Sequence, residues 1–259
     1  MEDKRFKIEK VKNSELLPFL RLDPIYNGNS IFVCNAKPEE SSLAAISEET
    51  KAMEAVLITG IPDIYVVPGY WLSASSYDSA EAIIKEIECD EDLCINYPLW
   101  AEDIIKKYLP KLEISYDNLY VYPEKSILKL SKHNKAQKIT CELYEAISIP
   151  DKFKKLFSSK DLIPESKFYG VIENNTLCAM GERLVDNGIS AAISQLITLE
   201  EHRKKGYATS VICGLVKEIL DENKLPFYLV SERNAASKSS CEKAGFILHS
   251  RIGYGEMSE

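Results

Sequence analysis

The segment Arg203-Lys204-Lys205-Gly206-Tyr207-Ala208 lies between a strand-like run and a long helix-like run. A glycine-containing loop that opens a helix presents backbone N–H groups without intrahelical partners, and the helix dipole adds positive character there. Such a helix start suits a pyrophosphate. Gly206 permits close backbone approach, and the basic residues before it add positive charge. Taken alone, the segment is equally compatible with a solvated basic loop.

The elements around this segment follow a regular order. Upstream, the alternation of apolar and polar residues and two turns predict three strands, at Lys167–Glu173, Leu177–Val185 and Ile189–Leu199. Downstream, apolar spacing and a terminal glycine predict a helix, a strand, a second helix and a final strand, at Tyr207–Glu222, Phe227–Val230, Ala235–Ala244 and from Phe246 onward.

Two motifs in this half resemble the GNAT superfamily of N-acetyltransferases. Arg203–Ala208 matches the family's acetyl-CoA loop, Gln/Arg-x-x-Gly-x-Gly/Ala, and Leu196–Glu200 looks like the splayed strand that leads into it. Asn234–Phe246 resembles the family's Asn-x-x-Ala/Ser…Gly-Phe helix. The resemblance covers about residues 130–259 and implies an α/β (α+β) acyl-CoA N-acyltransferase fold for the C-terminal half.

The resemblance also implies acetyl-CoA as the acyl-donor cosubstrate, with no metal. The backbone of Ile197 and Leu199 would hydrogen-bond the pantetheine arm as an added strand. Asn234 would reach the pantetheine or the thioester, and Ser237 would either line the same channel or lie on the helix surface. The pyrophosphate would be held by a run of backbone amides, with Arg203 supporting the loop: Lys204, Lys205, Gly206, Tyr207, Ala208 and Thr209.

The catalytic groups are less defined than the cofactor loop. Acyl transfer to an amine needs a base, donors to the tetrahedral oxyanion and an acid for the leaving thiolate. A backbone amide near Leu199 is the expected oxyanion donor. Many family members place a tyrosine on the second helix as the acid, and this chain has Cys241 there. Cys241 is therefore either the acid or a small packing residue.

The general base has several candidates. Glu182 on the predicted hairpin is the named hypothesis, and strand alternation leaves it facing either into the cleft or away from it. Gln195 and Glu201 lie closer to the loop in the sequence, and an ordered water is a further alternative. The three histidines, His133, His202 and His249, show no metal-ligand spacing.

The sequence pattern of the first half predicts a smaller α/β domain over residues 1–128. The GNAT domain is then expected at 129–259, with the boundary near 125–135. Helices are expected at Ser47–Leu57, Ser79–Ile87 and Trp100–Tyr108, and a strand at Ile64–Val67. No counterpart of the cofactor loop is present, so this half is a degenerate GNAT-like domain or a substrate cap. Its aromatic residues either line an acceptor cleft or fill the domain's own core: Tyr65, Tyr70, Trp71 and Trp100.

The composition and net charge of the chain exclude several kinds of protein. The chain of 259 residues has a net charge of −8, which argues against nucleic acid as a partner and favours a cationic small substrate. Its seven cysteines show no CxxC spacing, its N-terminus is charged, and no stretch approaches the roughly 18 apolar residues of a membrane span. We expect a cytoplasmic protein, either monomer or homodimer.

The sequence therefore predicts an N-acetyltransferase that moves an acetyl group from acetyl-CoA to a primary amine of a small molecule or amino acid. An acyltransferase with a longer acyl donor or a protein acceptor keeps the same fold. The alternative from another class is a catalytically silent CoA-binding sensor or interaction module.

Overall fold

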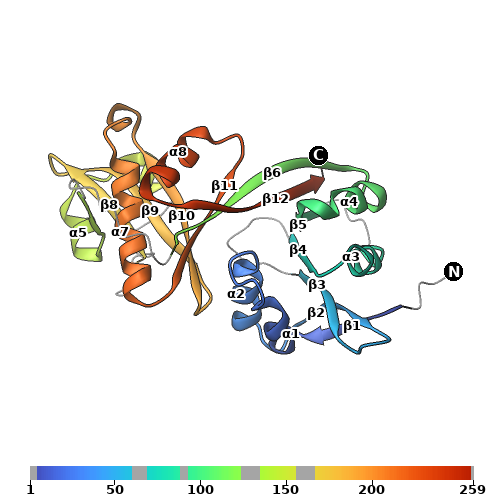
Figure 1. Cartoon of the computed structure of the whole chain (residues 1–259). Helices are drawn as coiled ribbons and strands as arrows, with labels where there is room; N and C mark the ends of the chain where they lie inside the picture. Colours follow the sequence, from blue (N-terminus) through green and yellow to red (C-terminus); the bar gives the residue numbers. More distant parts are fainter. Residues whose placement is uncertain (1–4, 60–68, 88–92, 124–134, 156–166, 258–259) are drawn as a thin grey trace. The chain divides into compact units, whose positions relative to one another are not determined.

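The chain divides into two compact units in the computed structural model (Figure 1). Unit 1 comprises Met1–Asn118 and Ser250–Glu259, and unit 2 comprises Leu119–His249. The structure describes residues 5–59, 69–87, 93–123, 135–155 and 167–257. Both units mix helices with strands, which confirms the expected α/β class. Within the described ranges, no helix is both long and apolar enough to cross a membrane.

Unit 1 is built on a sheet in the order β1-β2-β3-β4-β5. The first four strands pair antiparallel, and β4 pairs with β5 in parallel. The elements are β1 (Phe6–Lys12), α1 (Asn13–Leu20), α2 (Gly28–Ala36), β2 (Ser41–Ser47), β3 (Met53–Thr59), β4 (Gly69–Ala74), α3 (Tyr77–Ile84), β5 (Cys94–Pro98), η1 (Leu99–Ala101), α4 (Glu102–Tyr108) and β6 (Leu112–Val121).

Unit 2 has a sheet in the order β7-β8-β9-β10-β11, again antiparallel except for the parallel pair β10–β11. The elements are β7 (Ala136–Lys138), α5 (Cys141–Ala146), α6 (Asp151–Lys154), β8 (Phe168–Glu173), β9 (Thr176–Asp186), β10 (Ser190–Thr198), η3 (Glu200–His202), α7 (Tyr207–Asp221), β11 (Leu225–Ser231), α8 (Ala235–Ala244) and β12 (Ile247–Met257).

The two units repeat one order of elements. Apart from the short 3-10 turns, each described half runs strand, helix, helix, three strands, helix, strand, helix, strand. The sheet order and the position of the parallel pair are also the same. Inspection of the sequence shows no internal repeat, because the repetition lies in the topology rather than in the residues.

The division into units differs from the expected domains 1–128 and 129–259. The last residues of β12 belong to unit 1, where Ile252–Glu256 pair antiparallel with β5. Unit 2 begins within β6, at Leu119. Nearly all of the expected boundary, residues 125–134 of the range 125–135, lies outside the described residues.

One predicted helix is wrong. Ser47–Leu57 is the end of β2, a turn and most of β3. The Ser47 hydroxyl accepts the amide of Thr50 and closes the turn, and Lys51 adopts a positive φ of 59°. Ser47 therefore closes a turn and does not cap a helix. The predicted strand Ile64–Val67 lies outside the described residues.

The second half matches its predicted elements closely. α8 spans the predicted Ala235–Ala244 and ends at Gly245, which has a left-handed φ of 106°. α7 packs on one face of the sheet formed by β7 to β10 (Figure 1). On that face lies the main core of unit 2, which includes Val211, Leu215 and Ile219.

Arg183 joins α7 to the sheet. Its side chain is buried at 7% exposure and makes two hydrogen bonds of 2.6 Å to the Glu222 carboxylate at the end of α7. It also pairs with Asp186, the last residue of β9. These carboxylates raise the pKa of Arg183, while Arg183 and Lys224 lower the pKa of Glu222 to about 2.

We predict that Arg183→Ala destabilises unit 2 by about 1.5–3 kcal/mol, because it removes a buried cation and its hydrogen bonds to Glu222, while the 42% exposed Glu222 keeps its ion pair with Lys224. Urea unfolding measures the free energy of unfolding. Arg233→Ala, at an exposed position, is the matched control and should change it little. Equal losses in the two variants would contradict a structural role for the Arg183 pair.

Candidate active site

A cleft in unit 2 opens where β10 and β11 separate. The two strands pair in parallel only over Ser190–Ile193 and Leu225–Tyr228. β10 then continues to Thr198 through a bulge, where Gln195 has a φ of 51°. Because a bulge bends its strand, the end of β10 leaves β11 and the backbone edge that faces the gap stays unpaired by β11.

The backbone groups on this open edge are those of Thr198. The amide of Leu199 donates to the Cys178 carbonyl at 3.0 Å, so Leu199 and Ile197 lie in hydrogen-bonded positions of the β9–β10 ladder. Hydrogen-bonded and non-hydrogen-bonded positions alternate along antiparallel strands. The N–H and C=O of Thr198 therefore point away from β9. The expected pantetheine contacts of Ile197 and Leu199 stay predictions, and the amide of Thr198 is a backbone amide near Leu199 of the kind expected for the oxyanion donor.

The start of α7 forms one wall of the cleft. Gly206 caps the helix with a left-handed φ of 81°, a conformation that favours glycine. The first intrahelical hydrogen bond runs from the Ser210 amide to the Gly206 carbonyl at 3.0 Å. The amides of Tyr207, Ala208 and Thr209 therefore have no partner one turn back in the helix, and they form an anion-binding helix start.

The cleft is positively charged although the chain carries a net charge of −8. It encloses about 650 Å³, and no aspartate or glutamate is among the described residues that line it. Four cationic side chains line it: Lys152, Arg203, Lys204 and Lys243. Cations at a helix start suit the phosphates of a nucleotide-containing ligand.

Most of the predicted cofactor residues line this cleft. They are Ile197, Arg203, Lys204, Gly206, Tyr207, Ala208, Thr209, Asn234 and Ser237. Asn234 caps α8, where its side-chain oxygen accepts the Ser237 amide at 3.0 Å. Leu199 and Lys205 are not among the lining residues, and the Lys205 ammonium lies 5.9 Å from the centre of the Tyr207 ring.

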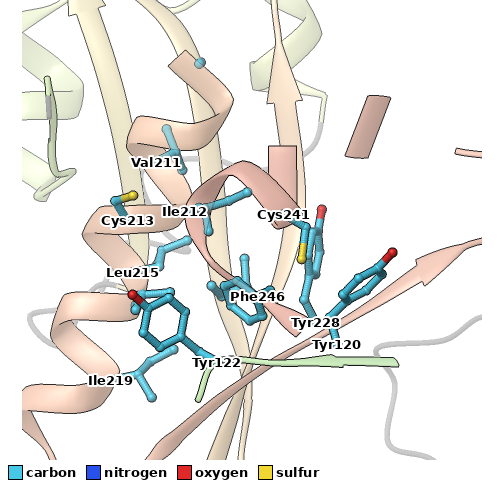
Figure 2. Close-up of a cluster of buried hydrophobic side chains, with 14 of the residues drawn as sticks. Tyr120, Tyr122, Val211, Ile212, Cys213, Leu215, Ile219, Tyr228, Cys241 and Phe246 are labelled. Carbon is cyan, nitrogen blue, oxygen red and sulfur yellow. The ribbon is translucent and has the colours of Figure 1, made fainter. Parts of the chain in front are cut away.

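The structure does not support Cys241 as the acid. Its side chain is fully buried in the core of unit 2, where burial raises the pKa of the thiol, and it does not line the cleft. In Figure 2 it lies beside the ring of Tyr228, a residue of the same core cluster. This placement favours the alternative that Cys241 is a packing residue.

A hydroxyl pair occupies the place where an acid is expected. Tyr228 is the last residue of β11 that pairs with β10, so it stands where the strands part. Its hydroxyl and that of Ser237 share a hydrogen bond of 2.9 Å, and Ser237 lines the cleft. Burial raises the pKa of Tyr228, so the phenol keeps its proton at neutral pH. Sequence reasoning missed Tyr228, because it lies on the strand rather than at the family's helical position.

Glu182 lies on the sheet face opposite α7. The neighbouring Gly181 faces α7, since a Cβ there would meet Val211 at 2.9 Å, and successive side chains alternate between faces. Glu182 is partly buried and is not among the residues that line the cleft, and neither are Gln195 and Glu201. Its role as the base stays a prediction.

A second unpredicted group lies beside the cleft. Donor atoms of Glu173, Cys178 and His202 lie within 4.8 Å of one another, and they are a carboxylate, a thiol and an imidazole, types that zinc accepts. However, Lys135 binds the Glu173 carboxylate at 3.0 Å and Lys205 approaches His202 at 3.4 Å. We assign no metal to this group, because both ammonium groups would repel a divalent cation.

Comparisons with known proteins agree with this geometry. The family model described as FR47-like protein matches residues 168–253. An X-ray structure of a Drosophila protein shares 12% identity with a TM-score of 0.69, over 97% of this chain and 98% of its own. A GCN5-related N-acetyltransferase from Sphaerobacter thermophilus shares 10% identity with a TM-score of 0.64, over 100% and 98%. No curated protein matches the chain by sequence.

A further similar structure is a tandem GNAT protein from the clavulanic acid biosynthesis pathway. It shares 12% identity with a TM-score of 0.55, over 98% of this chain and 99% of its own. Identities this low establish the fold and not the reaction.

We predict that Gly206→Glu abolishes acetyl-CoA binding, whereas Gly188→Glu does not. Both glycines have a left-handed φ, 81° and 86°, and open space at the Cβ position, so each substitution costs about 1 kcal/mol of backbone strain. Only Gly206 lies in the cleft, where a carboxylate would repel the phosphates. Calorimetric titration with acetyl-CoA measures the affinity, and equal affinities in the two variants would remove Gly206 from the binding site.

The fold of GNAT acetyltransferases thus spans the chain, and residues 168–253 match the family model described as FR47-like protein.

Proposed function

We propose that the chain is an acetyl-CoA-dependent N-acetyltransferase whose acceptor is the primary amine of a small molecule or amino acid. The observation that carries this proposal is the cation-lined cleft at the parting of β10 and β11, with the helix start of α7 on one side. The GNAT fold supports acyl transfer in general. The net charge of −8 favours a cationic acceptor such as an amine.

The residues of the cleft fit the parts of acetyl-CoA. The amides of Tyr207, Ala208 and Thr209 suit the pyrophosphate, and Arg203 and Lys204 add charge at the same end. The open edge at Thr198 suits the amide groups of the pantetheine arm, which would pair with it as an added strand. The bound cosubstrate would supply the acyl group as a thioester.

The chain's own groups then serve the transfer of the acyl group from sulfur to nitrogen. The carbon–sulfur bond breaks, a carbon–nitrogen bond forms, and the amine loses a proton while the thiolate gains one. The N–H of Thr198 would donate to the oxyanion, and its C=O would remain to accept from the pantetheine arm. A water in the open cleft would carry the amine's proton to solvent. The Ser237 hydroxyl would donate a proton to the thiolate and regain one from solvent, and Tyr228 would position Ser237 through their hydrogen bond.

We expect thiol release from acetyl-CoA to depend on one class of acceptor in a panel of amines and amino acids. The assay measures free CoA with time, and Gly206→Glu is the inactive control. Acetyl-CoA that binds and raises the melting temperature without turnover for any acceptor would instead establish the CoA-binding sensor. The absence of the family's helical tyrosine at Cys241 is the observation that favours this second candidate.

We predict that Ser237→Ala and Tyr228→Phe each lower kcat by about 10²-fold, within the range of general acid catalysis. The KM for acetyl-CoA should stay nearly constant, because neither hydroxyl is placed at the phosphates. Cys241→Ala should retain kcat within about threefold, since the thiol does not line the cleft. Steady-state kinetics separate these effects, and a loss confined to Cys241→Ala would return the acid role to the thiol.

We propose a reduced, cytoplasmic setting, in keeping with the six cysteines of the described residues, which form no disulfide bond.

A further inference from the structure

Unit 1 contains a cavity of its own, of about 770 Å³. It lies between the α1–α2 connection, the ends of β4 and β5, and the start of η1. Much of its wall is apolar and aromatic, from Phe19, Leu22, Leu99 and Trp100. Leu22 and Trp100 are 80% and 47% exposed, an unusual exposure for large apolar side chains. Exposed apolar groups around a cavity commonly mark a binding site.

The cavity occupies the same topological place as the cleft of unit 2. β4 and β5 pair in parallel only over Gly69–Trp71 and Cys94–Asn96, and β4 then continues to Ala74. The parting of β4 from β5 corresponds to that of β10 from β11, because both units have the same order of elements. Trp71 fills the core at 2% exposure, whereas Trp100 lines the cavity.

The connection that would bind phosphate is missing in unit 1. Only Ser75 and Ser76 separate β4 from α3, and the Ser76 hydroxyl accepts the Ser79 amide at 3.2 Å. The helix start is thus capped by the chain itself, with no glycine and no basic residue in the connection. The cavity therefore lacks the phosphate-binding elements of the unit 2 cleft.

Asn27 and Asp23 supply hydrogen-bond acceptors to the cavity wall, beside hydroxyl groups that can donate or accept. Asn27 is 2% exposed, and its side-chain NH₂ donates to the Leu20 carbonyl at 3.0 Å. Its Oδ1 has no hydrogen-bond partner among the described residues. A buried acceptor without a partner costs about 1–3 kcal/mol, so a ligand that donates to it gains affinity. The carboxylate of Asp23 lines the same cavity.

Arg251 is the one cation among the described residues of the cavity wall, and it interacts with residues that do not line the cavity. Arg251 lies 5.3 Å from the centre of the Tyr116 ring, and its charge helps to lower the pKa of Glu102. The Ser250 hydroxyl is buried without a partner and can donate or accept. A hydrogen-bond donor with positive charge therefore fits the cavity better than an anion does.

We propose that this cavity is a second ligand site, which binds a small primary amine with an aromatic or aliphatic body. The ammonium group donates to Asn27 Oδ1 beside Asp23, and the body packs on Phe19, Leu22 and Trp100. The site is separate from the acyl-CoA cleft of unit 2 and does not depend on the proposed transferase activity.

The direct test is binding of phenethylamine to the full chain without acetyl-CoA. Tryptophan fluorescence reports it, because Trp100 lines the cavity and the chain has only one other tryptophan. We expect saturable binding at least about tenfold tighter than that of 3-phenylpropionate, which carries a carboxylate in place of the amine. Asn27→Leu should weaken the binding of phenethylamine by about tenfold.

Charge variants at Leu22 provide a test that does not depend on Asn27 and its contact with Leu20. Leu22 is 80% exposed, so Leu22→Glu and Leu22→Lys should leave the fold intact. We expect Leu22→Glu to strengthen and Leu22→Lys to weaken phenethylamine binding, each by about threefold. The same two substitutions at Leu248, which is 51% exposed in unit 2, are the matched controls and should change nothing.

Two results would overturn the proposal. One is phenethylamine binding that is absent, or no tighter than that of 3-phenylpropionate. The other is binding that the Leu22 and Leu248 variants change equally. Because the readout needs neither acetyl-CoA nor turnover, its failure is distinguishable from failure of the transferase proposal.

Discussion

The separation of β10 from β11 is the constraint on which the site of unit 2 depends. Four residue pairs hold the two strands together, and the bulge at Gln195 then turns β10 away. The separation exposes the backbone of Thr198, places Tyr228 at the parting point and brings the start of α7 to one side of the gap. A regular parallel pair would satisfy the Thr198 backbone within the sheet. The cleft therefore exists because the ladder stops early.

The same architecture gives unit 1 a different site. The separation of β4 from β5 is repeated, but the short serine connection replaces the loop of Arg203–Ala208, and apolar side chains replace the ring of cations. Unit 1 thus repeats the element order of unit 2 and the parting of its strands without the phosphate-binding loop. The ligand that we propose for its cavity differs accordingly in charge from the one that we propose for unit 2.

Part of the fold and of the candidate site can be predicted from the sequence alone. The order of elements from Phe168 to the end of β12, the cofactor loop and the cap of α8 follow from local signals: turn residues, helix spacing, and the pair Asn234 and Gly245. Non-local features could not be read in this way. Which backbone groups of Thr198 and Leu199 bond to β9 depends on the register between β9 and β10. The hydrogen bond between Tyr228 and Ser237 forms only because the fold brings β11 and α8 together.

In the first half, too, local sequence patterns fail to predict features that depend on distant residues. Ser47–Leu57 consists of good helix formers, but Leu57 and its neighbours are buried in a sheet, where tertiary packing overrides local propensity. The two units share a topology without a repeat that is visible in the amino-acid sequence. The cavity beside Trp100 is lined by residues far apart in the sequence, such as Phe19 and Arg251. No local sequence pattern therefore predicts it.

Amide hydrogen exchange with and without acetyl-CoA tests the central claim most directly, because the claim assigns backbone groups. We expect new protection at Thr198 and at Tyr207–Thr209, with none at Ser73–Ser76 in unit 1. Protection that falls on Ser73–Ser76, or that leaves Thr198 and the start of α7 unchanged while acetyl-CoA is bound, would contradict the account.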